Sequence, residues 1–271
     1  MGAVQHASGR AADASGGQPA FGAAWLRLLG GFALSMAGAP VTLPVNGQRL
    51  LAYLSIRGQV PRPVVAGTLW PDVSEHNAHG SLRTTMWRLH RGGARLVETK
   101  GENLALAPEV TVDIQVFARA AQRALRSPVL LDEVGTEPGV DVDLLAASEL
   151  LPGWYDDWVI FERERLRQLR LHTLEAMAQR LASQCRFAAA LDTALEAIRI
   201  EPLRESAHRV VIGIHLAEGN AVEAVRHYRF VRDLLRDELG VEPSGQLIAM
   251  LPARLRLAGP RPAVTRLDMA R

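Results

Sequence analysis

The sequence contains a single cysteine and no long apolar segment, which argues against a disulfide-bonded protein and against a membrane-spanning protein. Because Cys185 is the only cysteine, the chain has no internal disulfide bond and no cysteine-based zinc site. A chain without disulfide bonds is typical of a reducing compartment. The longest apolar candidates, such as VVIGIHLA at 210–217, are interrupted by Gly or His and fall short of the ~18 residues that a membrane helix needs. The first twenty residues lack the continuous apolar core of a signal peptide. We therefore expect a cytoplasmic protein without membrane contact.

Lysine is also nearly absent, and the net charge is small. Among 31 basic residues Lys100 is the one lysine, and the formal net charge is +2. Because the net charge is small, the protein as a whole is not attracted to polyanions, although local patches of charge still steer binding. The arginine bias, together with many alanines and glycines, is typical of a GC-rich genome. Arginine content alone thus says little about function.

Motifs of catalysis are missing as well. The chain has no Gly-x4-Gly-Lys-Ser/Thr phosphate loop, and no Ser/His/Asp order or pair of catalytic carboxylates stands out. Glu75, His76 and His79 have helical spacing, but no further strong ligand lies nearby, so we predict no metal site. We expect neither an enzyme nor a bound cofactor.

The first half of the chain mixes short strand-like and helical segments. Residues 25–44 indicate short strands separated by Gly-Gly and Ala-Gly turns. Helical patterns follow at 48–58, at 61–70 and from Asp72 or Ser74 to 91, with capping-box character at Asp72-x-x-Glu75. Residues 95–113 then alternate around Lys100-Gly101-Glu102-Asn103, which predicts a hairpin. This order is that of a winged helix-turn-helix preceded by a small sheet.

A helix over 75–91 separates into two faces at ~100° per residue. The inward face is centred on Leu82 and contains Ala78, Thr85, Met86 and Leu89. The opposite and flanking positions are Gly80, Arg83, Thr84, Trp87, Arg88 and Arg91. Between 79 and 100 the chain has five basic residues and one acid, Glu98. Such a face suits the major groove of DNA, because arginine binds guanine and threonine or an aromatic ring contacts the thymine methyl group.

The hairpin after this helix supplies Lys100 and Asn103, which we expect to reach DNA phosphates and fix the register. A plainer interpretation of the helix is that Trp87 belongs to a domain interface and the arginines are solvated. The position of the helix, third in a series of strands, three helices and a hairpin, favours the DNA-binding interpretation.

The segment WYDDW at 154–158 combines aromatic and acidic side chains. One interpretation is a contact surface for RNA polymerase or a partner subunit. Its residues would be Trp154, Tyr155, Asp156, Asp157 and Trp158. The alternative is that Trp154 and Trp158 close the junction between two domains. The sequence leaves both interpretations open.

The second half contains an internal repeat. RFAAALDTAL at 186–195 matches NAVEAVRHYR at 220–229 with an offset of 34 residues, and each copy runs to a Glu-Pro pair. A 34-residue period of paired helices is typical of tetratricopeptide arrays, whose repeats stack because one pair cannot bury its faces alone. We expect helices near 162–184, 187–200, 203–218 and 220–239. The alternative is a generic helical bundle in an alanine-rich chain.

Several segments together resemble the Streptomyces antibiotic regulatory protein (SARP) family, and the resemblance covers nearly everything from 25 to about 250. They are LWPD (69–72), SLRTTMWRLHR (81–91), LLPGWYDDW (150–158), FERERLRQLRLHTLEAMAQRL (161–181), EPLRESAHR (201–209) and LLRDELGVEPS (234–244). The resemblance implies a response-regulator-type winged helix joined to a tetratricopeptide-like bacterial transcriptional activator domain. Family members activate transcription, often of secondary-metabolite gene clusters. They bind direct repeats near promoters as side-by-side dimers and contact RNA polymerase.

By this resemblance the recognition helix corresponds to 75–91, the loop before it to 71–75 and the wing to 97–106. The lack of an ATPase motif and of a phosphoreceiver pocket matches the short type of the family. Two departures are Gly80, which costs ~1 kcal/mol relative to Ala within a helix and favours a later helix start, and a long connector at 132–147.

We therefore predict an α+β N-terminal winged helix-turn-helix at 21–110 and an all-α tetratricopeptide-like activator domain at 111–257, with tails at 1–20 and 258–271. The expected function is a sequence-specific transcriptional activator. Its expected partners are double-stranded DNA, RNA polymerase and, on DNA, a second copy of the chain. The alternative is a protein-interaction adaptor that uses the repeat domain without functional DNA binding.

Overall fold

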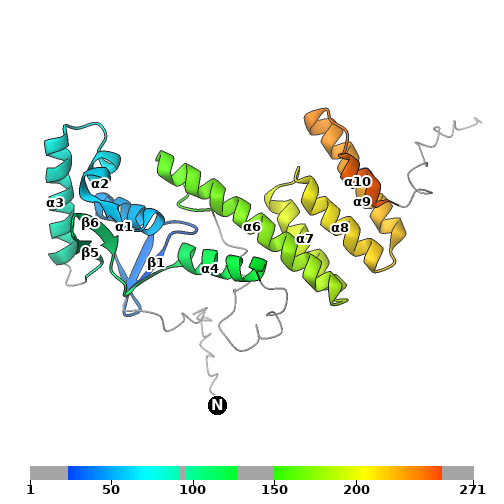
Figure 1. Ribbon diagram of the computed structural model, residues 1–271, viewed down its shortest axis with the longest axis horizontal. Helices are drawn as coiled ribbons and strands as arrows, with labels where there is room; N and C mark the ends of the chain where they lie inside the picture. The colour runs from blue at the N-terminus through cyan, green and yellow to red at the C-terminus, as the bar shows by residue number, and fades with distance from the viewer. Residues whose placement is uncertain (1–23, 92–94, 127–148, 252–271) are drawn as a thin grey trace, which may run out of the picture.

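The computed structural model describes residues 24–91, 95–126 and 149–251 (Figure 1). Its strands are β1 (Ala24–Arg27), β2 (Ala33–Met36), β3 (Ala39–Val41), β4 (Val60–Pro61), β5 (Val97–Lys100), β6 (Asn103–Leu106) and β7 (Val110–Val112). Its helices are α1 (Val45–Arg57), α2 (Arg62–Leu69), α3 (Glu75–Arg91), α4 (Asp113–Arg126), α6 (Asp157–Ser183), α7 (Phe187–Ile200), α8 (Glu205–Ala217), α9 (Ala221–Leu239) and α10 (Gly245–Met250). The predicted class, an α+β winged helix followed by helical repeats, is confirmed.

The N-terminal sheet has the strand order β3-β2-β1-β7. The short turns predicted within 25–44 produce the antiparallel pairs β1–β2 and β2–β3. The sequence pattern did not predict β7, which follows the hairpin and pairs in parallel with β1, Ala24 lying opposite Val110. The predicted domain boundary at 110–111 falls inside this strand.

The three predicted helices and the hairpin of the winged helix are present. Helix α1 buries Leu50, Leu51 and Leu54 and ends at Gly58, whose φ of +73° requires a residue without a side chain. Strands β5 and β6 form the hairpin, with Lys100 opposite Asn103, and β4 extends this sheet in the order β4-β6-β5.

The start of α3 differs from the predicted capping box. The helix begins at Glu75, and its first turn is closed by the Ala78 amide, which donates to the Ser74 carbonyl over 2.9 Å. Asp72 therefore lies ahead of the cap position, and within the described residues neither Asp72 nor Glu75 makes a capping hydrogen bond. Gly80 does not delay the helix, which runs without a break to Arg91.

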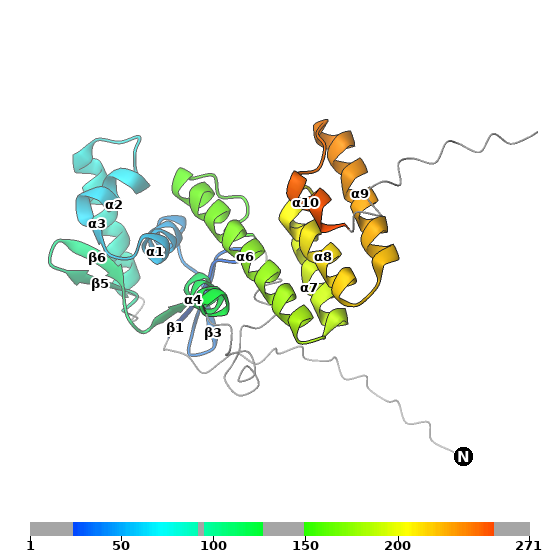
Figure 2. The same cartoon turned by 45° about the vertical axis from the view of Figure 1, so that its right-hand side comes forward.

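The C-terminal part is a stack of antiparallel helices. Helix α7 packs on α6, α8 on α7, and α9 on α8 (Figure 2). The four predicted helices are present with ends shifted by a few residues, and α6 starts earlier than expected, at Asp157. The short helix α10 was not predicted. It packs against α8 through Leu247, which is fully buried. No helix in the described ranges has both the length and the apolar character needed to cross a membrane.

One hydrophobic core joins the two parts. It extends from Leu28, next to the N-terminal sheet, through Trp158 to Leu174 on α6. At the first turn of α4 the buried Asp113 carboxylate accepts hydrogen bonds from the amides of Leu28 and Leu29, over 2.9 and 2.8 Å. Burial raises the pKa of Asp113, against the lowering effect of these amides. The winged helix and the repeats are therefore parts of one packed body.

Candidate nucleic-acid interface

The two faces predicted for α3 agree with its burial in the structure. The inward set is buried, and it comprises Ala78, Leu82, Thr85, Met86 and Leu89. The outward set is exposed, and it comprises Arg83, Thr84, Trp87, Arg88 and Arg91. Trp87 has 57% of its surface exposed, a large value for an indole ring. The helix thus presents one continuous basic and aromatic face, called here the α3 outer face.

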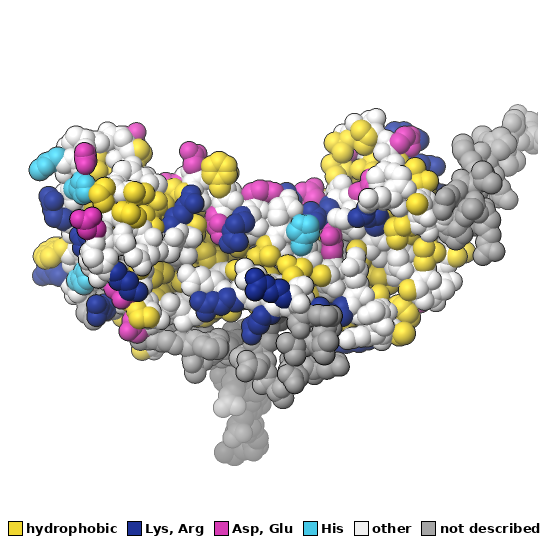
Figure 3. All heavy atoms as spheres, in the orientation of Figure 1, with side chains coloured by type: hydrophobic (Ala, Val, Ile, Leu, Met, Phe, Trp, Pro, Cys, Tyr) yellow, Lys and Arg dark blue, Asp and Glu magenta, His cyan; other side chains and the backbone are white. Residues whose placement is uncertain are grey.

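The arginines of the α3 outer face differ from several exposed arginines of the repeat helices. On the repeat helices Arg165, Arg199 and Arg226 each pair with a glutamate three residues earlier. Within the described residues Arg83, Arg88 and Arg91 make no ion pair with a carboxylate. Their positive charge is therefore not neutralised locally, and Figure 3 shows basic side chains along the edge of the molecule where α3 lies.

Trp87 and Arg91 contact each other. The Arg91 guanidinium carbon lies 4.7 Å from the centre of the Trp87 ring, which is a cation–π distance. At an exposed site such a contact contributes about 0.5–1 kcal/mol, so it orders both side chains without holding them rigidly. With 57% of its surface exposed, Trp87 is open to contact from outside the protein.

The hydroxyl group of Thr84 is engaged within the helix. Its Oγ1 donates to the Gly80 carbonyl over 3.0 Å. The side chain can still accept a hydrogen bond or offer its methyl group to a neighbour, because the donor alone is occupied. Both are among the contacts that a threonine makes to a base edge.

The wing residues lie where the hairpin prediction placed them, but Lys100 is paired. Its Nζ lies 2.5 Å from Oε1 of Glu98 on the same strand. In the protein without DNA, the positive charge of Lys100 is therefore partly compensated by Glu98. Arg62, which sequence reasoning did not select, donates from Nη2 to Thr99 Oγ1 over 2.9 Å and places a second cation beside the hairpin.

The aromatic segment at 154–158 lies mainly at the junction of the two parts. Trp158 is only 5% exposed, and its ring packs edge-on against Tyr53 of α1 at 5.3 Å and near Trp154 at 6.3 Å. Its predicted role as a partner contact is wrong, because the ring is inside the core. Asp156 pairs with Arg49 of α1 over 2.5 Å. The exposed members are Tyr155, at 81%, and Asp157.

Sequence reasoning missed the arginines that tie this junction together. Arg49 donates to the Leu69 carbonyl over 2.8 Å as well as to Asp156. Arg163 donates to the carbonyl groups of Leu150, Leu151 and Trp154 over 2.9 to 3.0 Å. In a chain with 31 basic residues no local pattern marks these two, because Asp156 lies 107 residues from Arg49.

Glu75 and His79, two of the three residues whose helical spacing raised the question of a metal site, both belong to α3. Their side chains approach to 3.8 Å between Oε1 and Nε2. In the part of the chain that the structure describes, no group of three or more His, Cys, Asp or Glu is arranged to hold a metal ion.

Comparisons with known proteins agree with this architecture. Residues 112–253 match the family model of the bacterial transcriptional activator domain. Among curated proteins no match is found. Among solved structures, the chain is similar to Mycobacterium tuberculosis EmbR in complex with a low affinity phosphopeptide, with 19% identity and a TM-score of 0.69 over 87% of this chain and 67% of that chain. At this identity the likeness concerns the fold alone. Because the family model matches more than half of the sequence, the chain belongs to the bacterial transcriptional activator domain family and is a transcription regulator of SARP type.

Proposed function

We propose that the protein is a sequence-specific DNA-binding activator that inserts α3 into the major groove. The observation that carries the proposal is the α3 outer face, where exposed arginines lack carboxylate partners among the described residues while the opposite face is buried. A major groove admits one helix, and arginine binds the O6 and N7 atoms of guanine through two parallel hydrogen bonds.

Within this proposal the residues divide into two roles. Arg83, Thr84, Trp87, Arg88 and Arg91 contact base edges or the flanking backbone. Lys100 and Asn103 on the wing contact phosphates, and Lys100 exchanges its Glu98 contact for a phosphate oxygen on binding. The phosphate contacts make affinity fall with added salt, because bound counterions are released.

The remaining partners follow from the family and from exposed side chains. We propose that the activator contacts RNA polymerase and binds direct promoter repeats as a side-by-side homodimer at a secondary-metabolite gene cluster. Tyr155 and Asp157 are the exposed candidates beside the junction for a polymerase contact. Val222, Phe230 and Leu239 leave apolar surface exposed on α9 of the repeat domain, which suits a contact between copies.

The test is a titration of purified protein against DNA fragments that it selects from genomic DNA. Replacing Arg88 or Arg91 with Ala is expected to weaken binding by about 1–3 kcal/mol if the side chain binds a base. The affinity of the wild type for a mixed-sequence duplex is expected to fall steeply between 50 and 200 mM NaCl, as is typical when several phosphates are contacted.

The matched control is Arg199→Ala, which removes one exposed arginine from α7 and should leave the affinity unchanged. If Arg88→Ala and Arg91→Ala both bind as tightly as the wild type, the assignment of α3 to the groove is wrong. If the wild type shows no salt-dependent affinity for any duplex, the protein is instead an adaptor that works through its repeat domain.

A further inference from the structure

Helix α4 has a row of basic side chains on the face that points away from the core. At ~100° per residue, Arg119, Arg123 and Arg126 lie within about 60° of one another around the helix. All three are exposed. Their spacing extends the row over about 10 Å along the helix axis. The row is called here the α4 ridge, and Figure 3 shows a group of basic side chains over α4.

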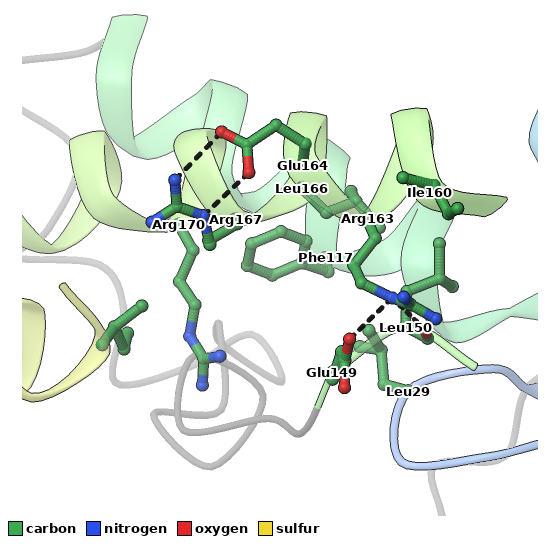
Figure 4. Close-up of a pocket in the computed structure, with 11 residues that line it drawn as sticks. Leu29, Phe117, Glu149, Leu150, Ile160, Arg163, Glu164, Leu166, Arg167 and Arg170 are labelled. Atoms are coloured by element: carbon green, nitrogen blue, oxygen red, sulfur yellow. Dashed lines mark hydrogen bonds and ion pairs between the residues drawn. The ribbon is translucent and has the colours of Figure 1, made fainter. Parts of the chain in front are cut away.

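The buried face of α4 fixes the orientation of the ridge. Phe117, Ala121 and Ala124 are buried on the side of the helix opposite to the ridge. The helix packs on α6 and on strands β1 and β7. In Figure 4 the Phe117 ring lies among side chains of α6, such as Leu166. The α4 ridge therefore faces solvent, and it cannot turn inward without breaking this packing.

The α4 ridge has no local counter-charge. The one acid of α4 is Asp113, which is buried at the first turn. Within the described residues, no ridge arginine makes an ion pair with a carboxylate. On the repeat helices, by contrast, Arg165, Arg199 and Arg226 each pair with the glutamate three residues earlier. The ridge therefore presents positive charge that a ligand can bind.

The stability of the helix does not account for the whole ridge. Arg123 and Arg126 lie in the last turn of α4, where a positive charge interacts favourably with the helix dipole. Arg119 lies before that turn. Its four-residue spacing from Arg123 places two like charges side by side, which destabilises a helix. This repulsion is relieved when an anionic partner lies across the ridge.

The position of the α4 ridge favours a protein partner over DNA. The inner face of α3 packs on α1, and α1 lies between α3 and α4 in both Figure 1 and Figure 2. The α3 outer face therefore points away from α4. Leu125, which is 43% exposed, borders the ridge and adds apolar surface, for which a phosphate backbone has no complement. An acidic protein segment supplies both carboxylates and apolar side chains.

We propose that the α4 ridge binds an acidic segment of a partner protein. Its carboxylates pair with the three ridge arginines through charge-assisted hydrogen bonds, and its apolar side chains contact Leu125. This contact is separate from the polymerase contact proposed at the start of α6, where the exposed charge has the opposite sign. The proposal does not depend on DNA binding.

The experiment measures, by fluorescence anisotropy at low salt, the binding of a labelled helical peptide of glutamate, leucine and alanine with its glutamates in one row. The comparison peptide has glutamine in place of every glutamate. The wild type is expected to bind the glutamate peptide about tenfold more tightly than the glutamine peptide. Combining Arg119→Gln, Arg123→Gln and Arg126→Gln should remove this tenfold difference, which is the expected sum of three exposed ion pairs.

The matched control removes the same net charge elsewhere. Combining Arg165→Gln, Arg199→Gln and Arg226→Gln replaces three exposed arginines of the repeat helices and should leave both affinities unchanged. Circular dichroism verifies that both triple variants are folded. The proposal is overturned if the ridge variant binds the glutamate peptide as tightly as the wild type, or if the control weakens that peptide equally.

Two further measurements distinguish other occupants of the α4 ridge. The ridge variant should bind selected DNA fragments as the wild type does, and a tenfold loss would assign the ridge to phosphates instead. The segment 127–148 has five acids and no basic residue. Replacing these acids with the corresponding amides should leave the peptide affinity unchanged. A tenfold gain would show that this segment of the chain itself occupies the ridge, and the partner proposal would be wrong.

Discussion

At the scale of single residues, His208 and His227 form a pair whose proton positions are determined by geometry. His208 Nε2 lies 2.8 Å from the Pro202 carbonyl, which can only accept, so this nitrogen carries the hydrogen. His208 Nδ1, 3.0 Å from His227 Nε2, is then the acceptor, and His227 donates. Both rings are neutral in this arrangement. Burial lowers the pKa of both, and the pKa of His227 falls to about 4, because protonated His208 and His215 would also repel a positive charge on its ring.

This pair predicts a loss of stability in weak acid. The unfolded chain binds a proton at each histidine near pH 6.5, whereas folded His227 binds one only near pH 4. Between these values the unfolded state holds more protons, so the free energy of unfolding decreases as the pH falls from 6.5 towards 4. Urea denaturation at pH 7.5 and pH 5.0 measures the decrease as a lower midpoint.

The control for this prediction is His227→Gln, because an amide group still donates to His208 but does not titrate. The decrease in midpoint between the two pH values should be smaller in the variant than in the wild type. An equal decrease in both proteins would show that His227 is not responsible.

At the scale of elements, α3 illustrates what the sequence can and cannot predict. The inward and outward faces follow from helical periodicity, and the burial of Leu82 and exposure of Trp87 agree with it. The pairing of Lys100 with Glu98 was not predicted, because alternating strand residues share a face but their side-chain rotamers are set by the folded hairpin. The capping box predicted at Asp72-x-x-Glu75 is not formed, because the spacing of residues alone does not identify the first residue of a helix.

Gly80 within α3 predicts a stabilising substitution. A Cβ atom there would lie 3.8 Å from Arg83 Nη2, an ordinary contact, and alanine has the higher helix propensity. Gly80→Ala is therefore expected to raise the free energy of unfolding by about 0.5–1 kcal/mol in a urea titration.

Gly58 supplies the opposing control. Its φ of +73° is unfavourable for any residue with a side chain, so Gly58→Ala should lower the free energy of unfolding by about 1 kcal/mol. A change of the same sign in both variants would contradict this explanation.

At the scale of the whole molecule, the junction was the least predictable part. The family resemblance and the two periodicities predict both halves, but not their mutual packing. That packing depends on contacts such as Arg49–Asp156 and Tyr53–Trp158, whose partners are about a hundred residues apart in the chain. The connector predicted at 132–147 lies outside the described residues. The parallel pairing of β7 with β1 belongs to the same class of long-range contact.

The junction predicts that both halves unfold together. Trp158→Ala removes a buried indole from the shared core and should lower the free energy of unfolding by about 3–5 kcal/mol, in the range typical of large-to-small core substitutions. Thermal unfolding followed by circular dichroism gives the size of the effect.

Tyr155→Ala is the companion variant, because this exposed ring should contribute within about 0.5 kcal/mol. In the wild type, fluorescence of the tryptophans and helical circular dichroism should report one coincident transition. Two separated transitions would show that the halves unfold independently.

The parallel pairing of β7 with β1 also affects the order of events during synthesis. Ala24 leaves the ribosome early, but its neighbour Val110 is made only after the entire winged helix. The β-bridge between Leu29 and Leu150 forms only after Leu150 has also been synthesised. Until then one edge of β1 has unpaired backbone groups, the kind of edge that recruits strands from other chains. During synthesis β1, the first strand of the described residues, therefore has one unpaired edge until Val110 is made, and premature termination before residue 110 leaves that edge open.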